Sequence, residues 1–150
     1  MKHLLAIIIL CIVIVTTNGC TPFSYFYMVN KLNQSVPLTI QIGKNSEHLE
    51  EYHHLMLHYA DSILVIDNIT KEQLNKKLLY NIIRSTDSST TVTCVLPPHS
   101  TTNIGEGAKI LPQQFAWIAI TKPSGTDTLT YTNLWQQSQS SRFRYVYTVE

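Results

Sequence analysis

The sequence predicts a mainly β fold, an antiparallel β-sandwich with about seven to eight strands. Two observations lead to this prediction: short segments in which apolar and polar residues alternate, and the Gly, Pro, Asn and Ser residues that separate them. Alternation with period two puts the apolar residues of a strand on one face, and turn-forming residues end the strand. A third observation is helical spacing in the middle of the chain, which predicts a helical insertion around 46–60 and a short helix from 71.

The predicted strands run through most of the chain after residue 22. FAWIAIT is apolar on both faces, which predicts a central strand with Trp117 in the core. IGEGAKI at 104–110 predicts a turn or bulge, and QQSQSS at 136–141 a loop. The alternating segments are FSYFYMVN at 23–30, VPLTIQI at 36–42, SILVID at 62–67, TTVTCVL at 90–96, FAWIAIT at 115–121, TLTYT at 128–132 and RFRYVYTV at 142–149, with LLYNII at 78–83 as a further candidate.

The two helical predictions rest on different signals. In the insertion, apolar residues recur at steps of three and four, the spacing of one helix face; they are Leu49, Tyr52, Met56 and Tyr59. The second helix would begin in TKEQL, where Thr70 as N-cap and Gln73 three residues on resemble a capping box. Helix and strand both stay open for 74–84. Many short strands with one helical insertion predict an immunoglobulin-like sandwich, without the Cys…Trp…Cys spacing of antibody-type domains.

Residues 1–19 have the features of a secretory signal peptide. Lys2 precedes an uncharged apolar core at 4–15, which is too short for a membrane span of roughly 20 residues. The segment ends in Gly19-Cys20 and resembles a bacterial lipoprotein signal, in which a small residue precedes the cysteine that receives lipid. Ordinary cleavage after small residues and an uncleaved anchor are the alternatives. The lipoprotein interpretation predicts a lipid on Cys20 and a single domain at 20–150.

Net charge limits the classes of partner that this protein can bind, and the cysteine content limits its disulfides. Without Lys2, ten basic and ten acidic residues give the mature chain a net charge of zero. A neutral chain without a basic cluster argues against nucleic acid as a partner, because phosphate binding needs many Lys and Arg residues. Cys11 falls in the signal segment, and Cys94 between Thr93 and Val95 is predicted to be a small buried hydrophobe. If Cys20 carries no lipid, a Cys20–Cys94 disulfide becomes an alternative.

Several motifs together carry a resemblance to a protein group. The lipobox-like start, MVNKLNQSVPLTIQI, VLPPHSTTNIGEG and the terminal YVYTV together resemble small envelope lipoproteins of Bacteroidetes type with an immunoglobulin-like β-sandwich. The resemblance implies a membrane-anchored protein of the bacterial cell envelope, on the periplasmic face or the cell surface, and implies no activity. TPFSY follows Cys20 where such surface lipoproteins carry a short acidic export tract, which favours the periplasmic face.

One polar cluster suggests a metal site. If 46–60 is helical, Glu50, His54 and His58 lie one turn apart on one stripe, with Asp61 nearby, and such ligands can bind zinc. The same pattern describes the solvated polar face of an ordinary amphipathic helix, which is the favoured interpretation. The His-Glu-x-x-His arrangement of metalloproteases is absent from the sequence. No cofactor is therefore expected.

Aromatic and hydroxyl residues give the remaining candidate sites. Trp135 and Tyr131 are candidates for a sugar-stacking surface, because exposed rings on a β-sandwich can pack against sugar faces. Asp61-Ser62-Ile63 and Asp127-Thr128-Leu129 resemble acceptor sites for O-glycosylation in exported Bacteroidetes proteins, which makes Ser62 and Thr128 candidate glycosylation sites. Asn33 and Asn68 match the N-glycosylation pattern of a eukaryotic secretory route.

The expected function is that of a lipid-anchored envelope protein, not an enzyme, whose domain binds or supports another envelope protein or a glycan. No catalytic residue is assigned. The alternatives are a carbohydrate-binding module that uses Trp135 and Tyr131, and a metal-dependent enzyme built on the His54/His58 stripe. Fold alone does not distinguish these alternatives.

Overall fold

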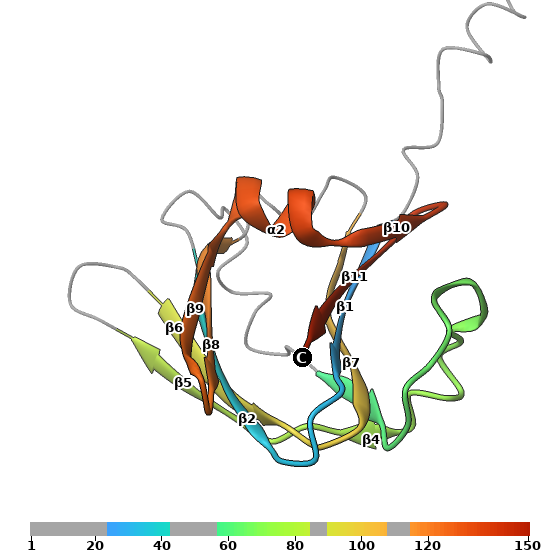
Figure 1. The fold of residues 1–150 in the computed structure, drawn as a ribbon, viewed down its shortest axis with the longest axis horizontal. Helices are drawn as coiled ribbons and strands as arrows, with labels where there is room; N and C mark the ends of the chain where they lie inside the picture. Colours follow the sequence, from blue (N-terminus) through green and yellow to red (C-terminus); the bar gives the residue numbers. More distant parts are fainter. Residues whose placement is uncertain (1–23, 43–56, 85–89, 108–114) are drawn as a thin grey trace, which may run out of the picture.

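The computed structural model describes residues 24–42, 57–84, 90–107 and 115–150. Within them the fold is mainly β, with one sheet of six strands and one of five. The sheets lie face to face (Figure 1). The mainly β prediction is confirmed, and the described ranges contain eleven strands rather than seven or eight: β7 and three short strands were not predicted, and the predicted SILVID strand does not form. The three short strands are β3 (His58–Ala60), β4 (Lys76–Lys77) and β10 (Gln139–Ser141).

The five-stranded sheet is antiparallel throughout and matches the predicted segments closely. Its order is β5-β6-β2-β8-β9. Alternate residues of its strands are buried, as period two requires for a sheet with one face on the core. β8 lies inside the sheet but next to the edge strand, so β2 takes the central position. The strands are β2 (Val36–Ile42), β5 (Tyr80–Arg84), β6 (Thr90–Leu96), β8 (Phe115–Lys122) and β9 (Gly125–Thr130).

The six-stranded sheet is mixed rather than purely antiparallel. Its order is β10-β11-β1-β7-β3-β4, and β1 runs parallel to β11 from the Tyr25–Arg144 pair to the Asn30–Val149 pair. The prediction of a purely antiparallel sandwich was therefore wrong at this pair. A hairpin can join only antiparallel neighbours, so a parallel pair must come from segments far apart in the chain. The remaining strands are β1 (Ser24–Asn30), β7 (Ser100–Gly107) and β11 (Arg144–Val149).

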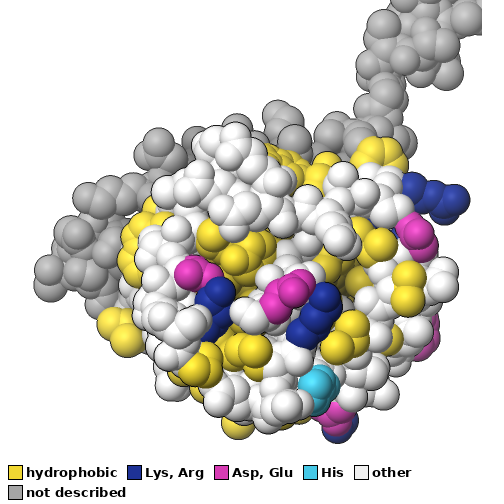
Figure 2. All heavy atoms as spheres, viewed as in Figure 1, with side chains coloured by type: hydrophobic (Ala, Val, Ile, Leu, Met, Phe, Trp, Pro, Cys, Tyr) yellow, Lys and Arg dark blue, Asp and Glu magenta, His cyan; other side chains and the backbone are white. Residues whose placement is uncertain are grey.

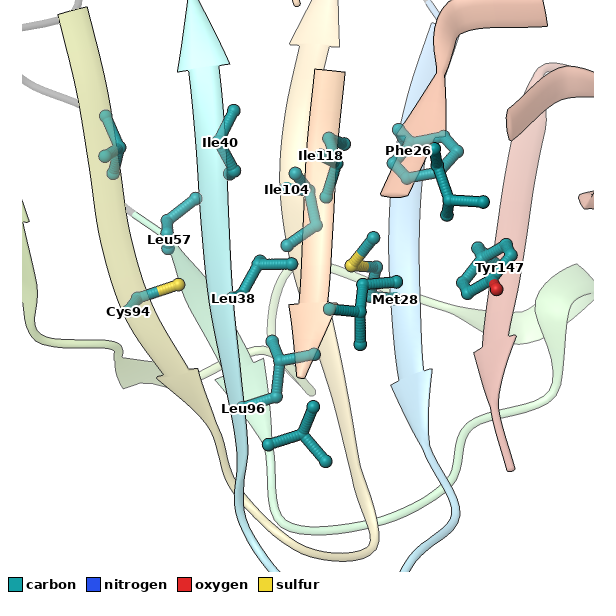
Figure 3. Close-up of a cluster of buried hydrophobic side chains, with 14 of the residues drawn as sticks. Phe26, Met28, Leu38, Ile40, Leu57, Cys94, Leu96, Ile104, Ile118 and Tyr147 are labelled. Carbon is teal, nitrogen blue, oxygen red and sulfur yellow. The ribbon is translucent and has the colours of Figure 1, made fainter. Parts of the chain in front are cut away.

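The main hydrophobic core lies between the two sheets. In Figure 3, Phe26 and Met28 of one sheet point toward Leu38 and Ile118 of the other. Cys94 belongs to this core as a free, 5% exposed cysteine, which confirms its prediction as a small buried hydrophobe. The two inner faces therefore bury their apolar side chains against each other, as in a β-sandwich.

A second hydrophobic cluster covers the outer face of the six-stranded sheet. The chain between β3 and β4, residues 61–75, runs over this face and is called the covering segment here. Its Ile69 and Leu74 pack with Tyr27 and Val146 of the sheet. Arg144 fastens the segment by donating from its two terminal nitrogens to the carbonyl oxygens of Asp67, at 3.1 Å, and Ile69, at 3.3 Å. β1 is therefore buried on both faces.

Both helical predictions differ from the structure wherever residues are described. The helix predicted around 46–60 falls largely on residues 43–56, which lie outside the described residues. His58–Ala60 at its end is strand β3, because Tyr59 and Ala60 pair with β7. No helix begins at residue 71, although Thr70 donates its backbone N–H to Gln73 Oε1 at 2.9 Å, so part of the capping box forms. The chain makes one turn there and then extends to pair with β3.

Three other segments differ from their predictions. SILVID is not a strand; its Leu64 and Ile66 pack on the second cluster, and Ile66–Asn68 form a 3-10 turn. The predicted turn at 104–110 is in its described part the end of strand β7. TLTYT at 128–132 forms the end of β9 and the start of helix α2 (Tyr131–Gln137). The predicted loop at 136–141 forms the end of α2 and strand β10. α2 crosses from one sheet to the other (Figure 1) and buries Leu134 in the main core.

Candidate functional site

The outer face of the five-stranded sheet is the most distinctive surface among the described residues. Its strands bury alternate residues inward, so the intervening residues point outward in register across the sheet. Seven of these fourteen residues are threonines, and we call the surface the threonine face. Its members are Pro37, Thr39, Gln41, Asn81, Ile83, Thr91, Thr93, Val95, Trp117, Ala119, Thr121, Thr126, Thr128 and Thr130.

None of the residues of the threonine face carries a charge. Surfaces of soluble domains are roughly 25–35% charged, so about four of fourteen positions would be expected to carry one. The five strands do contain charged residues, Arg84, Lys122 and Asp127. In the register they take the alternate positions, opposite Thr90, Gly125 and Ile120, and not those of the threonine face. The charged residues of these strands thus share the register positions of their inward-facing residues.

Trp117 lies in the threonine face, and the prediction that it belongs to the core was wrong. Ile118 and Ile120 of the same strand are buried, whereas Trp117 is half-buried at the alternate position. In register it lies between Gln41 of β2 and Thr130 of β9. The tryptophan is thus flanked by a side-chain amide and a hydroxyl on the outer surface.

Hydrogen bonds fix several polar groups of the threonine face. Thr91 donates from its hydroxyl to Gln41 Oε1 at 2.8 Å, and Gln41 Nε2 donates to the carbonyl oxygen of Thr90 at 3.2 Å. The hydroxyls of Thr121 and Thr126 lie 3.3 Å apart across β8 and β9. A threonine hydroxyl has one proton and two lone pairs, so these groups keep capacity for a further hydrogen bond. The face therefore offers neutral donors and acceptors held in place by the sheet.

Apolar side chains gather at the β5 side of this face. Ile83 is 58% exposed and Val95 is 49% exposed, and Leu79, which directly precedes β5, is 90% exposed. Exposed aliphatic residues on neighbouring strands are less common than isolated ones. The face thus grades from an aliphatic side at β5 and β6 to a hydroxyl-rich side around Trp117 and β9.

Charged side chains on another surface are largely paired. Lys122 Nζ lies 2.6 Å from Asp127 Oδ2, and this hydrogen bond raises the pKa of Lys122. Burial raises the pKa of Tyr147 on the facing strand β11. On the face shown in Figure 2, basic and acidic side chains lie side by side with hydrophobic side chains between them. The Lys122–Asp127 pair neutralises charge locally and joins β8 to β9.

The predicted metal stripe is not assembled in the described residues. Glu50 and His54 lie outside them, and His58 is a half-buried residue of β3 opposite Lys77. Asp61, the nearby carboxylate, forms an ion pair with Lys76. Within residues 24–42, 57–84, 90–107 and 115–150, no group of three or more His, Cys, Asp or Glu residues could hold a metal ion.

The predicted sugar-stacking pair falls on helix α2. Tyr131 is the first residue of the helix, and its side chain is not among those described. Trp135 is half-buried and packs edge-on against Tyr145, with 3.9 Å between the ring centroids. This contact joins α2 to β11, so Trp135 contributes to holding the helix in place.

Of the predicted modification sites, all except Cys20 lie at exposed positions among the described residues. Cys20 lies outside the described residues. Ser62 is exposed in the covering segment, and its carbonyl oxygen accepts a hydrogen bond from the Thr101 hydroxyl at 2.9 Å. Thr128 is exposed on the edge strand β9 and belongs to the threonine face, so a glycan attached there would occupy that face. Asn33 and Asn68 are exposed as well.

Sequence reasoning missed Trp117 and the threonine face for one reason. The alternation of threonines with apolar residues in TTVTCVL and TLT was visible, but nothing in one strand shows which strands become its neighbours. A count of charge at the outward positions of all predicted strands would have found the signal.

The described part of the chain contains no helix long and apolar enough to cross a bilayer. The chain matches no protein-family model, no curated protein and no solved structure.

Proposed function

We propose that this protein is a non-enzymatic binding module of the bacterial cell envelope, anchored by a lipid on Cys20, which contacts another envelope component through the threonine face. The observation that carries the proposal is the difference between the two outer faces of the sandwich. The covering segment packs on the outer face of the six-stranded sheet. On the other outer face, Ile83 of β5 and Val95 of β6 remain exposed, as do the β9 threonines Thr126, Thr128 and Thr130.

The anchoring part of the proposal rests on the sequence. Gly19-Cys20 ends an apolar segment of signal-peptide length, and strand β1 begins at Ser24, only a few residues later. A lipid on Cys20 would hold the domain close to the membrane, on the periplasmic face or at the cell surface. An immunoglobulin-like type of sandwich is part of the same proposal and follows from the resemblance to envelope lipoproteins.

Mass spectrometry of the mature N-terminus tests the anchor. The expected result is a first residue Cys20 that carries diacylglycerol, and a Cys20→Ser variant that is released from the membrane fraction. A mature protein that begins elsewhere, or an unmodified Cys20, would show that the anchor proposal is wrong while leaving the binding face untouched.

Site-specific photo-crosslinking in cells tests the binding face. A photoreactive residue at Thr93, in the middle of the threonine face, is expected to form a crosslink to an envelope component. The matched control carries the same residue at the exposed position Thr132 of α2 and is expected to give no such product. Equal crosslinking at both positions, or none at Thr93, would contradict the proposal.

A further inference from the structure

We propose that the threonine face binds a neutral polysaccharide chain, with Trp117 as the residue on which a sugar ring stacks. This inference rests on the proposed binding function and names the chemistry of its partner. Three properties of the face support it: its lack of charge, its ordered hydroxyl and amide groups, and its single half-buried tryptophan.

The absence of charge selects against the alternative partners. Nucleic acids and anionic polysaccharides bind surfaces that supply Lys and Arg, because neutralising their charges contributes much of the affinity. The charged residues of these strands take inner register positions, and Lys122 is already paired with Asp127. A neutral chain loses no ionic hydration on contact and meets no unpaired charge on this face. Charge complementarity therefore points to an uncharged partner.

The side-chain chemistry favours a sugar over a protein. Protein interfaces take most of their binding energy from Trp, Tyr and Arg, whereas threonine is under-represented among such residues. A sugar ring presents several hydroxyl groups that both donate and accept, and threonine hydroxyls have the same dual capacity. Gln41, held by its hydrogen bond from Thr91, adds an amide beside Trp117. The face thus matches the hydrogen-bonding pattern of a sugar chain.

The geometry of the sheet gives the face room for several sugars. One row of outward residues crosses the five strands from Ile83 through Thr91, Gln41 and Trp117 to Thr130. With about 4.8 Å between neighbouring strands, this row is roughly 19 Å long. A neighbouring row contains Thr93, Thr39, Ala119 and Thr128, whose small side chains leave the surface low beside Trp117. We infer that the chain lies across the strands, along these two rows.

Affinity electrophoresis of the mature protein in detergent tests the inference. The gels contain one of four neutral polysaccharides, namely hydroxyethylcellulose, laminarin, dextran and galactomannan, or the anionic polysaccharide alginate. Retardation is expected in at least one neutral gel and not in alginate. Trp117→Ala is expected to weaken the retarding interaction about tenfold or more, as for a central aromatic contact. Trp135→Ala is expected to leave it unchanged.

A second variant tests the same inference if Trp117→Ala unfolds the protein. Thr39→Lys introduces one charge in the middle of the face without removing any core residue, and it is expected to abolish retardation. Thr132→Lys makes the same change at an exposed position of α2 and is expected to bind as the unmodified protein does. Circular dichroism confirms that each variant is folded.

Four outcomes would overturn the inference. They are no retardation in any neutral gel, equal retardation in alginate, loss of binding in Trp135→Ala but not in Trp117→Ala, and unchanged binding in a folded Thr39→Lys variant. A crosslink at Thr93 to an envelope protein, combined with no retardation, would remove the sugar as partner and keep the binding function. Absence of both would remove both.

Discussion

Asn30 donates a hydrogen bond from its side-chain Nδ2 to the carbonyl oxygen of Pro97 over 2.8 Å, although 67 positions separate the two residues. The same fully buried amide donates to the carbonyl oxygen of Gln34 at 2.9 Å and accepts from the backbone N–H of Leu32 at 3.0 Å. One side chain therefore joins the turn after β1 to the turn after β6. Because the turn after β1 leads into β2, this contact also links the two sheets at one end of the sandwich.

Replacing this amide should destabilise the domain strongly. Asn30→Ala removes the partner of these backbone groups and of the Leu96 carbonyl oxygen, to which Asn30 Nδ2 also donates at 3.4 Å, and unpaired buried polar groups cost about 1–3 kcal/mol each. We expect the free energy of unfolding to fall by about 2–4 kcal/mol, allowing for partial rescue by water. Urea denaturation measures the change. Asn75→Ala, at an exposed position, is the control and should have little effect; equal losses in both variants would contradict this role of Asn30.

Two neighbouring threonines of β7 should respond in opposite directions to the same substitution. The Thr102 hydroxyl is buried without a hydrogen-bond partner among the described residues. The Thr101 hydroxyl accepts from the N–H of Leu64 and donates to the carbonyl oxygen of Ser62, both at 2.9 Å. Thr102→Val should therefore raise the unfolding free energy by about 1 kcal/mol, and Thr101→Val should lower it by about 1–3 kcal/mol. A shift of the same sign in both thermal melts would refute the assignment.

The guanidinium of Arg144 should hold the covering segment on its sheet. Arg144→Met removes the hydrogen bonds to the carbonyl oxygens of Asp67 and Ile69, and the expected loss is about 1–2 kcal/mol. Hydrogen exchange should become faster in residues 61–75 than in β2. Arg142→Met, in the exposed turn of the same hairpin, is the matched control and should leave the exchange pattern unchanged.

The turn between β10 and β11 should gain stability from a glycine. Ser141 pairs with Arg144, so Arg142 and Phe143 form a two-residue loop, and Arg142 has a φ of 53°. Hairpin turns of this length favour glycine where φ is positive. Arg142→Gly should raise the unfolding free energy by about 1 kcal/mol, because a side chain in this region costs roughly that much. Thermal unfolding measures it, and a lowered melting temperature would argue against strain at this position.

Cys94 should be unreactive in the folded protein. Burial raises the pKa of its thiol from 9.0 to about 12. The folded state thus holds this proton more tightly than the unfolded chain, so the contribution to stability is complete below pH 9.0 and is lost as the pH rises toward 12. Iodoacetamide at about pH 8 should modify Cys94 only after denaturation, since the thiolate is the reactive species. The stability of Cys94→Ala should fall less at alkaline pH than that of the unmodified protein. Modification of Cys94 at equal rates in folded and unfolded protein would contradict its burial.

The sequence predicted those features of the fold that depend on local pattern. β2 and β6 alternate cleanly, β8 is a short apolar run, and each forms close to its predicted position. β7 was missed because STTNIGEG has two glycines and little alternation, and it is a strand because β1 and β3 pair with it on either side. The capping residues Thr70 and Gln73 met as predicted, yet burial of Leu74 and pairing of Lys76 with Tyr59 outweighed the local preference for a helix.

The candidate site was less predictable than the fold. Trp135 was favoured as a surface residue because polar residues surround it in sequence. Its ring packs against Tyr145 of β11, a contact that its sequence neighbours do not indicate. Trp117 was assigned to the core because its neighbours in sequence are apolar, whereas period two places it opposite Ile118 and Ile120. The threonine face exists only after five strands are set side by side. Sequence indicates which residues alternate, and pairing decides which surface they form.

The parallel pair of β1 and β11 sets an order of events during folding. β1 lies between β11 and β7, so neither of its partners is a neighbour in the chain. Contacts between distant segments carry a large loop-closure entropy and slow the folding reaction. The first strand of the domain cannot complete its pairing until residues 144–149 have been synthesised. The six-stranded sheet is therefore completed only when the whole domain is present, and the β1–β11 pair is a late step in its assembly.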